Sequence, residues 1–246
     1  MAKKAKNEAG SKKIHVNIYF ISPILGSLPA KKEILTEYIQ SKAPVKTAEI
    51  EAEVEYLDAT DDELKDRVTI FPKSKSGNVF FFDYVMKGFF KNACHAMREV
   101  VGSVSSDLSA YKTKIDNCIF IDQRYLVFKD NATNEMIPKE ELTILQRPLR
   151  ASTPLGPRTT LSASEMMKPE VHLSMDIDIR DANLYPYVIE WLEYGKVNGL
   201  GQWHNGGYGR FLFEEVLPDG TVVSSNASNR DELIKEYYEF EGFEEI

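Results

Sequence analysis

Apolar and polar residues alternate in several short stretches of the chain, which is the period of strands with one buried face. The first such stretch runs from Ile14 to Ile21 and places an isoleucine, valine or phenylalanine at every second position. Other strands are expected at Ala48 to Leu57, Val68 to Phe71, Val79 to Phe82, Ile115 to Phe128, Thr143 to Ala151, Arg158 to Ala163, Val171 to Ile179 and Arg210 to Val216.

Other stretches repeat their apolar positions every three or four residues, as amphipathic helices do. The strongest runs from Asp83 to Val101, and Gly102 suits its end. Further helices are expected at Lys31 to Lys42, Tyr185 to Val197 and Asn229 to Phe240. Because strands and helices do not strictly alternate, the pattern favours an α+β fold, an antiparallel sheet with helices on one face. We expect one domain over residues 14–246, preceded by a flexible basic tail at 1–13.

Charge is unevenly spread along this acidic chain, whose formal net charge is −8. Such a balance argues against a general nucleic-acid coat, since non-specific affinity comes mainly from neutralising phosphates. Acidic residues gather at Glu49 to Asp66 and Asp231 to Ile246, and basic residues at the amino terminus, at Lys87 to Arg98 and around Arg147. This separation permits a positive groove on an acidic protein.

The composition favours a cytoplasmic protein without cofactor or metal. The lysine-rich start has no apolar core of the kind that a signal peptide needs, and no stretch has the length of a membrane span. Cys94 and Cys118 have no second cysteine or histidine at ligand spacing, so both are expected to be buried thiols.

A glycine-rich segment precedes the strand expected at Arg210 to Val216. Five glycines fall within its eleven residues, interleaved with aromatic and basic side chains: Gly199, Gly201, Gly206, Gly207 and Gly209, with Trp203, His204, Tyr208 and next Arg210. Such a loop can bring its backbone close to phosphates while the aromatic rings stack on bases. Alternatively, the glycines serve only the backbone angles of a turn. The segment lacks the Gly-Lys-Ser/Thr ending of a phosphate-binding P-loop, so nucleotide hydrolysis is not expected.

Three arginines form a second candidate site. Arg147 and Arg150 lie close together and Arg158 follows among small hydroxyl residues. A guanidinium can bind a phosphate through two parallel hydrogen bonds. The alternative is a hairpin whose arginines pair with the surplus carboxylates.

Two motifs resemble the RAMP superfamily, the repeat-associated proteins that form the RNA-binding backbone of CRISPR effector complexes. The motifs are Lys87-Gly88 near the start of a long helix and the late loop from Gly201 to Phe211, with Ser164 to Met167 between them. The chain also looks similar to uncharacterised bacteriophage proteins. Residues Asp83 to Met86 lack the Gly-Ser-Ser lead-in that the family usually has.

The resemblance implies a ferredoxin-like core of the RNA-recognition type that holds RNA or single-stranded DNA. Lys87 and Lys91, four residues apart on one helix face, would then contact phosphates. Their alternative is an ordinary solvated helix edge.

No catalytic residue is predicted. If the chain cleaved RNA as the guide-processing branch of the family does, His204 and His15 would be the histidines to test. The acidic end, with Phe240, Phe243 and Ile246, is either a docking peptide for a protein partner or a helix that packs on its own sheet.

Three hypotheses follow. The first is a non-catalytic protein that binds RNA or single-stranded DNA and assembles side by side along the strand, encoded by a phage. The second is a phage protein-interaction or counter-defence factor that acts through its acidic surface. The third is a metal-independent ribonuclease.

Overall fold

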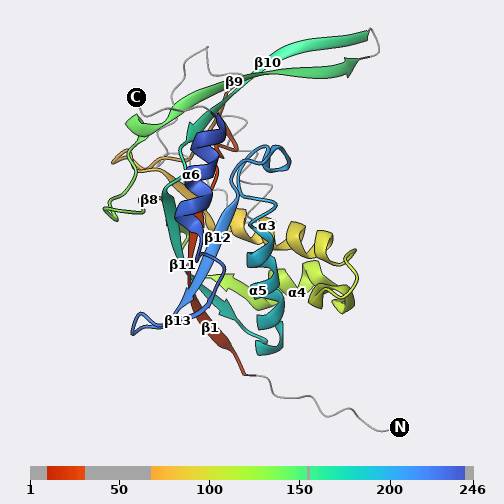
Figure 1. Cartoon of the computed structure of the whole chain (residues 1–246). Helices are drawn as coiled ribbons and strands as arrows, with labels where there is room; N and C mark the ends of the chain where they lie inside the picture. The colour runs from red at the N-terminus through yellow and green to blue at the C-terminus, as the bar shows by residue number, and fades with distance from the viewer. Residues whose placement is uncertain (1–9, 31–67, 154–155, 242–246) are drawn as a thin grey trace.

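The computed structural model describes residues 10–30, 68–153 and 156–241, which form an α+β fold with two main sheets (Figure 1). The expected helix at 31–42 and strand at 48–57 lie outside the described residues. None of the helices in the described ranges combines the length and apolarity that a bilayer crossing needs.

The larger sheet is antiparallel and has the order β13-β12-β1-β11-β6, with β8 also pairing with β11. Its strands are β1 (Lys12–Phe20), β6 (Ile119–Ile121), β8 (Lys129–Asp130), β11 (Val171–Ile179), β12 (Phe211–Val216) and β13 (Val222–Ser225). The helices α3 (Asp83–Met97) and α5 (Tyr185–Tyr194) connect β1 to β6 and β11 to β12. The chain therefore follows a β-α-β-β-α-β path through this sheet, the order of elements in the ferredoxin-like motif.

One face of this sheet carries the main core. The alternation predicted for the first strand is confirmed, since Ile14, Val16, Ile18 and Phe20 are all buried. They pack with α3, α5 and the short helix α4 (Tyr111–Cys118), which lie on one side of the sheet (Figure 1). The largest buried side chain on these helices is Trp191, which contacts Phe90 across the α3–α5 packing.

Helix α6 (Arg230–Glu241) packs apart from the helices that cover the main core. Ile234 of this helix is buried with Ile21, Leu212 and Ala227 in a separate small cluster. Leu212 points away from the main core because it neighbours the inward Phe211 and Phe213 on β12. The sheet thus offers an apolar strip on its second face. The acidic helix packs on this strip, which is the second of the two alternatives given for it by the sequence.

The second sheet has the order β2-β10-β4-β3, with β9 pairing with β10. Its strands are β2 (Ile24–Leu25), β3 (Leu28–Pro29), β4 (Val68–Ile70), β9 (Thr143–Thr153) and β10 (Gly156–Met167). The pair β10–β4 is parallel and the other pairs are antiparallel. The β9–β10 hairpin extends away from the body of the molecule (Figure 1). At its base, Glu165 accepts from Lys73 at 2.5 Å and from the Phe71 amide at 2.8 Å, which ties the hairpin to the core.

A third pairing joins β5 (Phe80–Phe82) to β7 (Tyr125–Val127). Short 3₁₀ turns complete the structure: η2 (Val104–Asp107), η3 (Lys139–Glu141), η4 (Ala182–Leu184) and η5 (His204–Gly206).

The strand predicted at Ile115 to Phe128 is wrong in its first part. Residues 111–118 are the helix α4, in which Tyr111 and Ile115, four residues apart, face the core. The remainder divides into β6 and β7, which belong to different sheets.

Two predicted helices end earlier than expected. Helix α3 stops at Met97, so Val100 is exposed, and Gly102 has a positive φ of 86° in the turn that follows. Helix α5 stops at Tyr194, and the next residue, Gly195, has no room for a side chain because a Cβ there would lie 2.4 Å from the Phe211 ring.

Candidate nucleic-acid interface

The glycine loop is closed by its own backbone. The Leu200 amide donates to the Gly209 carbonyl at 2.9 Å, and the Gly209 amide donates to the Pro23 carbonyl at 2.7 Å. A Cβ at Gly199 or Gly209 would collide with the opposite side of the loop, and one at Gly201 would lie 2.5 Å from the Leu25 carbonyl oxygen. The structure therefore supports the reading that these glycines serve the loop's backbone. Gly207 has open space around it, but its φ of +90° lies in the left-handed region that favours glycine, so it too serves the loop's backbone.

Polar side chains attach the loop to the second sheet. The Gln202 Oε1 atom accepts from the hydroxyls of Thr69 on β4 and Ser164 on β10, at 2.6 and 2.8 Å. The backbone N–H of Gln202 also donates to the Leu25 carbonyl at 3.1 Å. These bonds hold the next residue, Trp203, at a defined place beside the β9–β10 hairpin.

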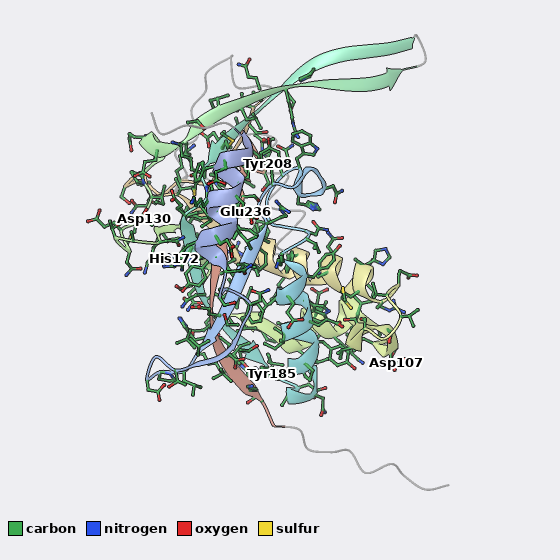
Figure 2. The ribbon with its side chains drawn as sticks, viewed as in Figure 1. Asp107, Asp130, His172, Tyr185, Tyr208 and Glu236 are labelled. Atoms are coloured by element: carbon green, nitrogen blue, oxygen red, sulfur yellow. The ribbon has the colours of Figure 1, made fainter. Side chains whose placement is uncertain are left out.

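Three side chains form what we call the arginine–aromatic stack: Arg147, Trp203 and Tyr208. The Trp203 and Tyr208 rings are stacked with centroids 5.1 Å apart and an interplanar angle of 17°. The Arg147 guanidinium carbon lies 3.9 Å from the Trp203 ring centroid. Gly206 allows this arrangement, because a Cβ there would lie 2.7 Å from the indole. Tyr208 sits near the point where the hairpin leaves the body of the molecule (Figure 2).

Arg147 carries hydrogen-bonding capacity that the described residues do not use. Its Nε and Nη1 atoms are buried and have no hydrogen-bond partner among those residues. Burial lowers the pKa of the guanidinium from its ordinary value, and the charge of Tyr208 opposes that shift. Trp203 remains 43% exposed, so the stack is open to solvent on one side.

Arg210 resembles Arg147 in part. Its buried Nε also has no hydrogen-bond partner among the described residues. Its backbone amide donates to the Ser22 hydroxyl at 2.9 Å, which fixes the end of the loop against β1.

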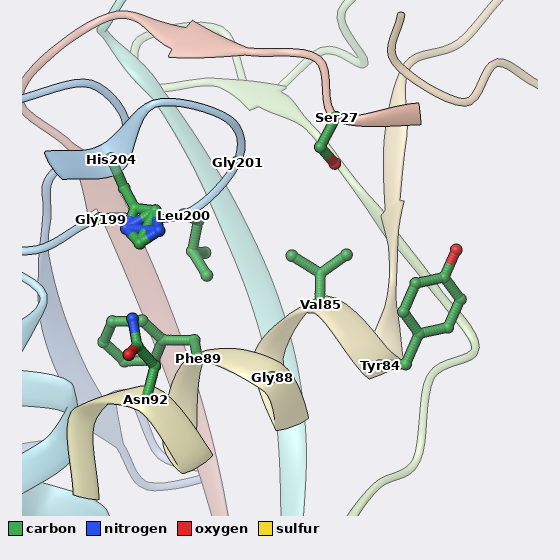
Figure 3. A pocket seen from close by; sticks show the side chains of 10 residues that line it. All are labelled: Ser27, Tyr84, Val85, Gly88, Phe89, Asn92, Gly199, Leu200, Gly201 and His204. Atoms are coloured by element: carbon green, nitrogen blue, oxygen red, sulfur yellow. The ribbon is translucent and has the colours of Figure 1, made fainter. Parts of the chain in front are cut away.

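A pocket of about 220 Å³ lies between α3 and the glycine loop (Figure 3). Gly88, Phe89 and Asn92 line it from the helix, and Leu200, Gly201 and His204 line it from the loop. Burial lowers the pKa of His204, so its imidazole is neutral near pH 7.

The structure does not bring Lys87 and Lys91 to this pocket. The Lys87 ammonium lies 4.6 Å from the Phe120 ring centroid, and Lys91 forms an ion pair with Asp116 at 2.6 Å. Both lysines therefore lie on the flank of α3 that faces α4 and β6, as a helix edge would. The residue of the Lys87-Gly88 motif that lines the pocket is the glycine.

Arg150 and Arg158 lie on the β9–β10 hairpin, where Arg150 is paired with Thr159 and Arg158 with Ala151. Their side chains are outside the described set. Of the three predicted arginines, only Arg147 is seen at the loop.

The two candidate histidines for cleavage lie in separate places. His15 Nδ1 is 2.8 Å from Asp176 Oδ1 on the face of the larger sheet opposite the main core, whereas His204 lies in the loop. In the described ranges no three His, Cys, Asp or Glu side chains are grouped to hold a metal.

Sequence reasoning missed the residues that position this site. Gln202 and Asn198 are unremarkable in the sequence, and the partners of Gln202 lie 133 and 38 residues away. The one available signal was the spacing of Gly88 and Asn92, which are four apart on the predicted helix and therefore share one of its faces.

Comparison with known proteins leaves the family open. No protein-family model matches the chain, and no curated protein matches it. Among solved structures, the chain resembles one in the cryo-EM structure of the Type III-B Cmr-beta bound to cognate target RNA, with 10% identity and a TM-score of 0.40. The match covers 88% of this chain and 60% of that chain. A TM-score this low establishes no common function.

Proposed function

We propose that this protein binds single-stranded nucleic acid, RNA or DNA, at the face formed by the arginine–aromatic stack and the neighbouring pocket, and that it does not cleave the strand. The observation that carries the proposal is Arg147, whose guanidinium lies over Trp203 with Nε and Nη1 unpaired among the described residues.

Leaving buried donors unsatisfied is costly, about 1–3 kcal/mol for each group and more where it is charged. A phosphate oxygen or a base carbonyl supplies the acceptors that Arg147 lacks, and the guanidinium fork suits such planar recognition. Binding would therefore offset the free-energy cost of leaving these Arg147 donors unpaired in the free protein.

The aromatic part of the stack suits a strand whose bases are unpaired. Single-stranded nucleic acids bind where aromatic side chains offer stacking platforms beside cations, and every base has a face to stack. Trp203 is partly exposed and is held in place by Tyr208, Arg147 and the loop, so little side-chain freedom is lost on binding. The path of the larger sheet supports the further proposal that the core is ferredoxin-like and related to the RAMP superfamily.

The absence of cleavage is proposed from the pocket's chemistry. Of the described residues that line it, His204 and Tyr84 are the ionisable ones, and none is a carboxylate or a lysine. General acid–base cleavage of RNA needs a donor and an acceptor of protons at the reacting atoms. A ribonuclease would thus need groups that this pocket does not present.

Fluorescence anisotropy with labelled single-stranded RNA and DNA of equal length tests the proposal. We expect wild type to bind at low salt and Arg147→Ala or Trp203→Ala to weaken binding about 5- to 150-fold, the range that follows from about 1–3 kcal/mol for a base stacked on an aromatic ring. Arg180→Ala is the matched control, because Arg180 is exposed and pairs with Asp178. It follows Ile179, which pairs with Lys12 at the start of β1, whereas the loop bonds to Pro23 beyond the other end of that strand.

Two results would reject the proposal. One is no salt-dependent binding of either nucleic acid by the wild type. The other is equal weakening by Arg147→Ala and Arg180→Ala, which would point to net charge instead of the stack. Side-by-side assembly is checked with the same samples, by the mass of complexes on strands of increasing length.

A further inference from the structure

We propose that the pocket between α3 and the glycine loop takes up one nucleobase of the bound strand and reads its hydrogen-bonding edge. This inference rests on the proposed function and names the part of the ligand that enters the pocket.

The size of the pocket suits one flat ring system. Its volume of about 220 Å³ is below the roughly 300–1,000 Å³ of clefts that bury drug-sized ligands. Phe89 and Leu200 line it with apolar surface, and Phe89 is itself held by the Phe211 ring at a centroid distance of 5.1 Å. A rigid apolar wall of this kind is suited to the face of an aromatic base.

The polar groups of the pocket are neutral. Asn198 Nδ2 donates to the Tyr194 hydroxyl at 3.3 Å, which turns Asn198 Oδ1 toward His204 Nδ1 at 2.6 Å. Since Nδ1 then carries the proton, the lone pair of His204 is on Nε2 and acts as an acceptor. Asn92 supplies an amide with both a donor and an acceptor, and in Figure 3 it rises from α3 toward the His204 ring.

This set of groups favours a base over a phosphate. Among the described residues, no lysine or arginine lines the pocket, and a neutral imidazole offers a phosphate no charge. A base edge, in contrast, presents donors and acceptors in one plane, which an amide and an imidazole nitrogen can match.

Gly88 is the strongest single indication that an unfilled pocket between α3 and the glycine loop has a function. A glycine inside a helix costs about 0.5–1 kcal/mol relative to alanine. Its φ is not in the positive range, and a Cβ there would meet no described atom within 4 Å. The fold therefore gives no steric reason for this glycine, whereas a side chain at this position would project into the pocket.

The pocket and the stack serve the same strand because they share the loop. Trp203 and His204 are consecutive residues at the start of η5, with Trp203 in the stack and His204 in the pocket. A strand that lies across the indole therefore follows the same loop that lines the pocket.

Filling the pocket tests the inference. Gly88→Leu places a good helix former in the open space, and Gly88→Ala, which adds only a methyl group, is the smaller step of the same series. Wild type and both variants are titrated with oligo-U, oligo-A and oligo-C of equal length, and thermal unfolding confirms that each variant is folded.

We expect wild type to distinguish the three homopolymers and Gly88→Leu to bind them more weakly, by about tenfold or more for the preferred one, within the range of a stacked base. Gly88→Leu should also bind the three with nearly equal affinity. His204→Phe, which removes the acceptor, should change the order of preference while retaining binding.

The outcomes separate the two proposals. If wild type binds strands and Gly88→Leu binds with unchanged affinity and preference, the pocket takes no base and the inference fails while the proposed function stands. If wild type binds no strand at all, the proposed function fails, and the inference with it.

Discussion

Gly209 shows how closely one residue controls the loop. Its φ is +68°, and a Cβ there would collide with the Leu200 carbonyl oxygen. We therefore expect Gly209→Ala to lower the free energy of unfolding by about 1–3 kcal/mol, since strain at positive φ adds to the collision. Urea unfolding followed by circular dichroism measures the loss. Gly88→Ala, in open space on α3, should instead be neutral or stabilising by up to about 1 kcal/mol.

We expect His172 to make the stability depend on pH. Burial lowers its pKa, Lys129 and Arg230 lower it further, and Asp130 opposes them. Figure 2 shows His172 and Asp130 near α6. Because the unfolded chain binds this proton more readily, stability is fully present above the unfolded pKa of about 6.5 and is lost as the pH falls below it.

The corresponding experiment compares urea unfolding at pH 7.5 and 5.5. We expect wild type to lose more stability over this range than His172→Gln, which has no proton to gain. His204, whose pKa burial also lowers, adds a loss of the same sign in both proteins. Identical pH dependence in the two proteins would show that His172 does not contribute.

At the scale of elements, α6 is attached by a cluster separate from the main core. Ile234 is its buried anchor, against Leu212 and Ile21. We expect Ile234→Ala to cost about 2 kcal/mol, the lower end of the range for such truncations because the cluster is small and peripheral. Hydrogen exchange should show the α6 amides losing protection while those of α3 do not. Glu236→Ala, on the exposed side, is the control and should change little.

At the scale of the whole molecule, the number of phosphates that the protein's cations neutralise sets how strongly salt acts on binding. Each phosphate neutralised on a single strand contributes a slope of about −0.7 in log K against log salt, so two arginines at the loop, Arg147 and Arg210, give roughly −1.4. Titrations between low and moderate KCl measure the slope. A value steeper than about −3 would mean that further cations take part, such as Lys87, Lys91 or the hairpin arginines.

The positions of strands and helices along the chain were largely predictable, because they depend on local periodicity. Val171 to Ile179 alternates and is a strand with those bounds, and the helical spacing from Asp83 located α3. Errors arose where the period changes without a glycine or proline to mark it. Ile115 ends a helical pair with Tyr111 yet also begins a strand-like run, and the sequence around it fits both.

The sequence by itself determined that the chain forms an α+β fold, that a glycine loop precedes β12, and that Trp203, Tyr208 and Arg147 are candidates for the site. Tertiary structure decided which candidates meet. Arg147 reaches Trp203, 56 positions later, because β9 pairs with β10 and Ser164 of β10 bonds to Gln202 of the loop. Lys91, on the predicted helix, pairs with Asp116 instead. Periodicity reports which side of an element is buried, but contacts between elements depend on how those elements pack, and no local pattern encodes that.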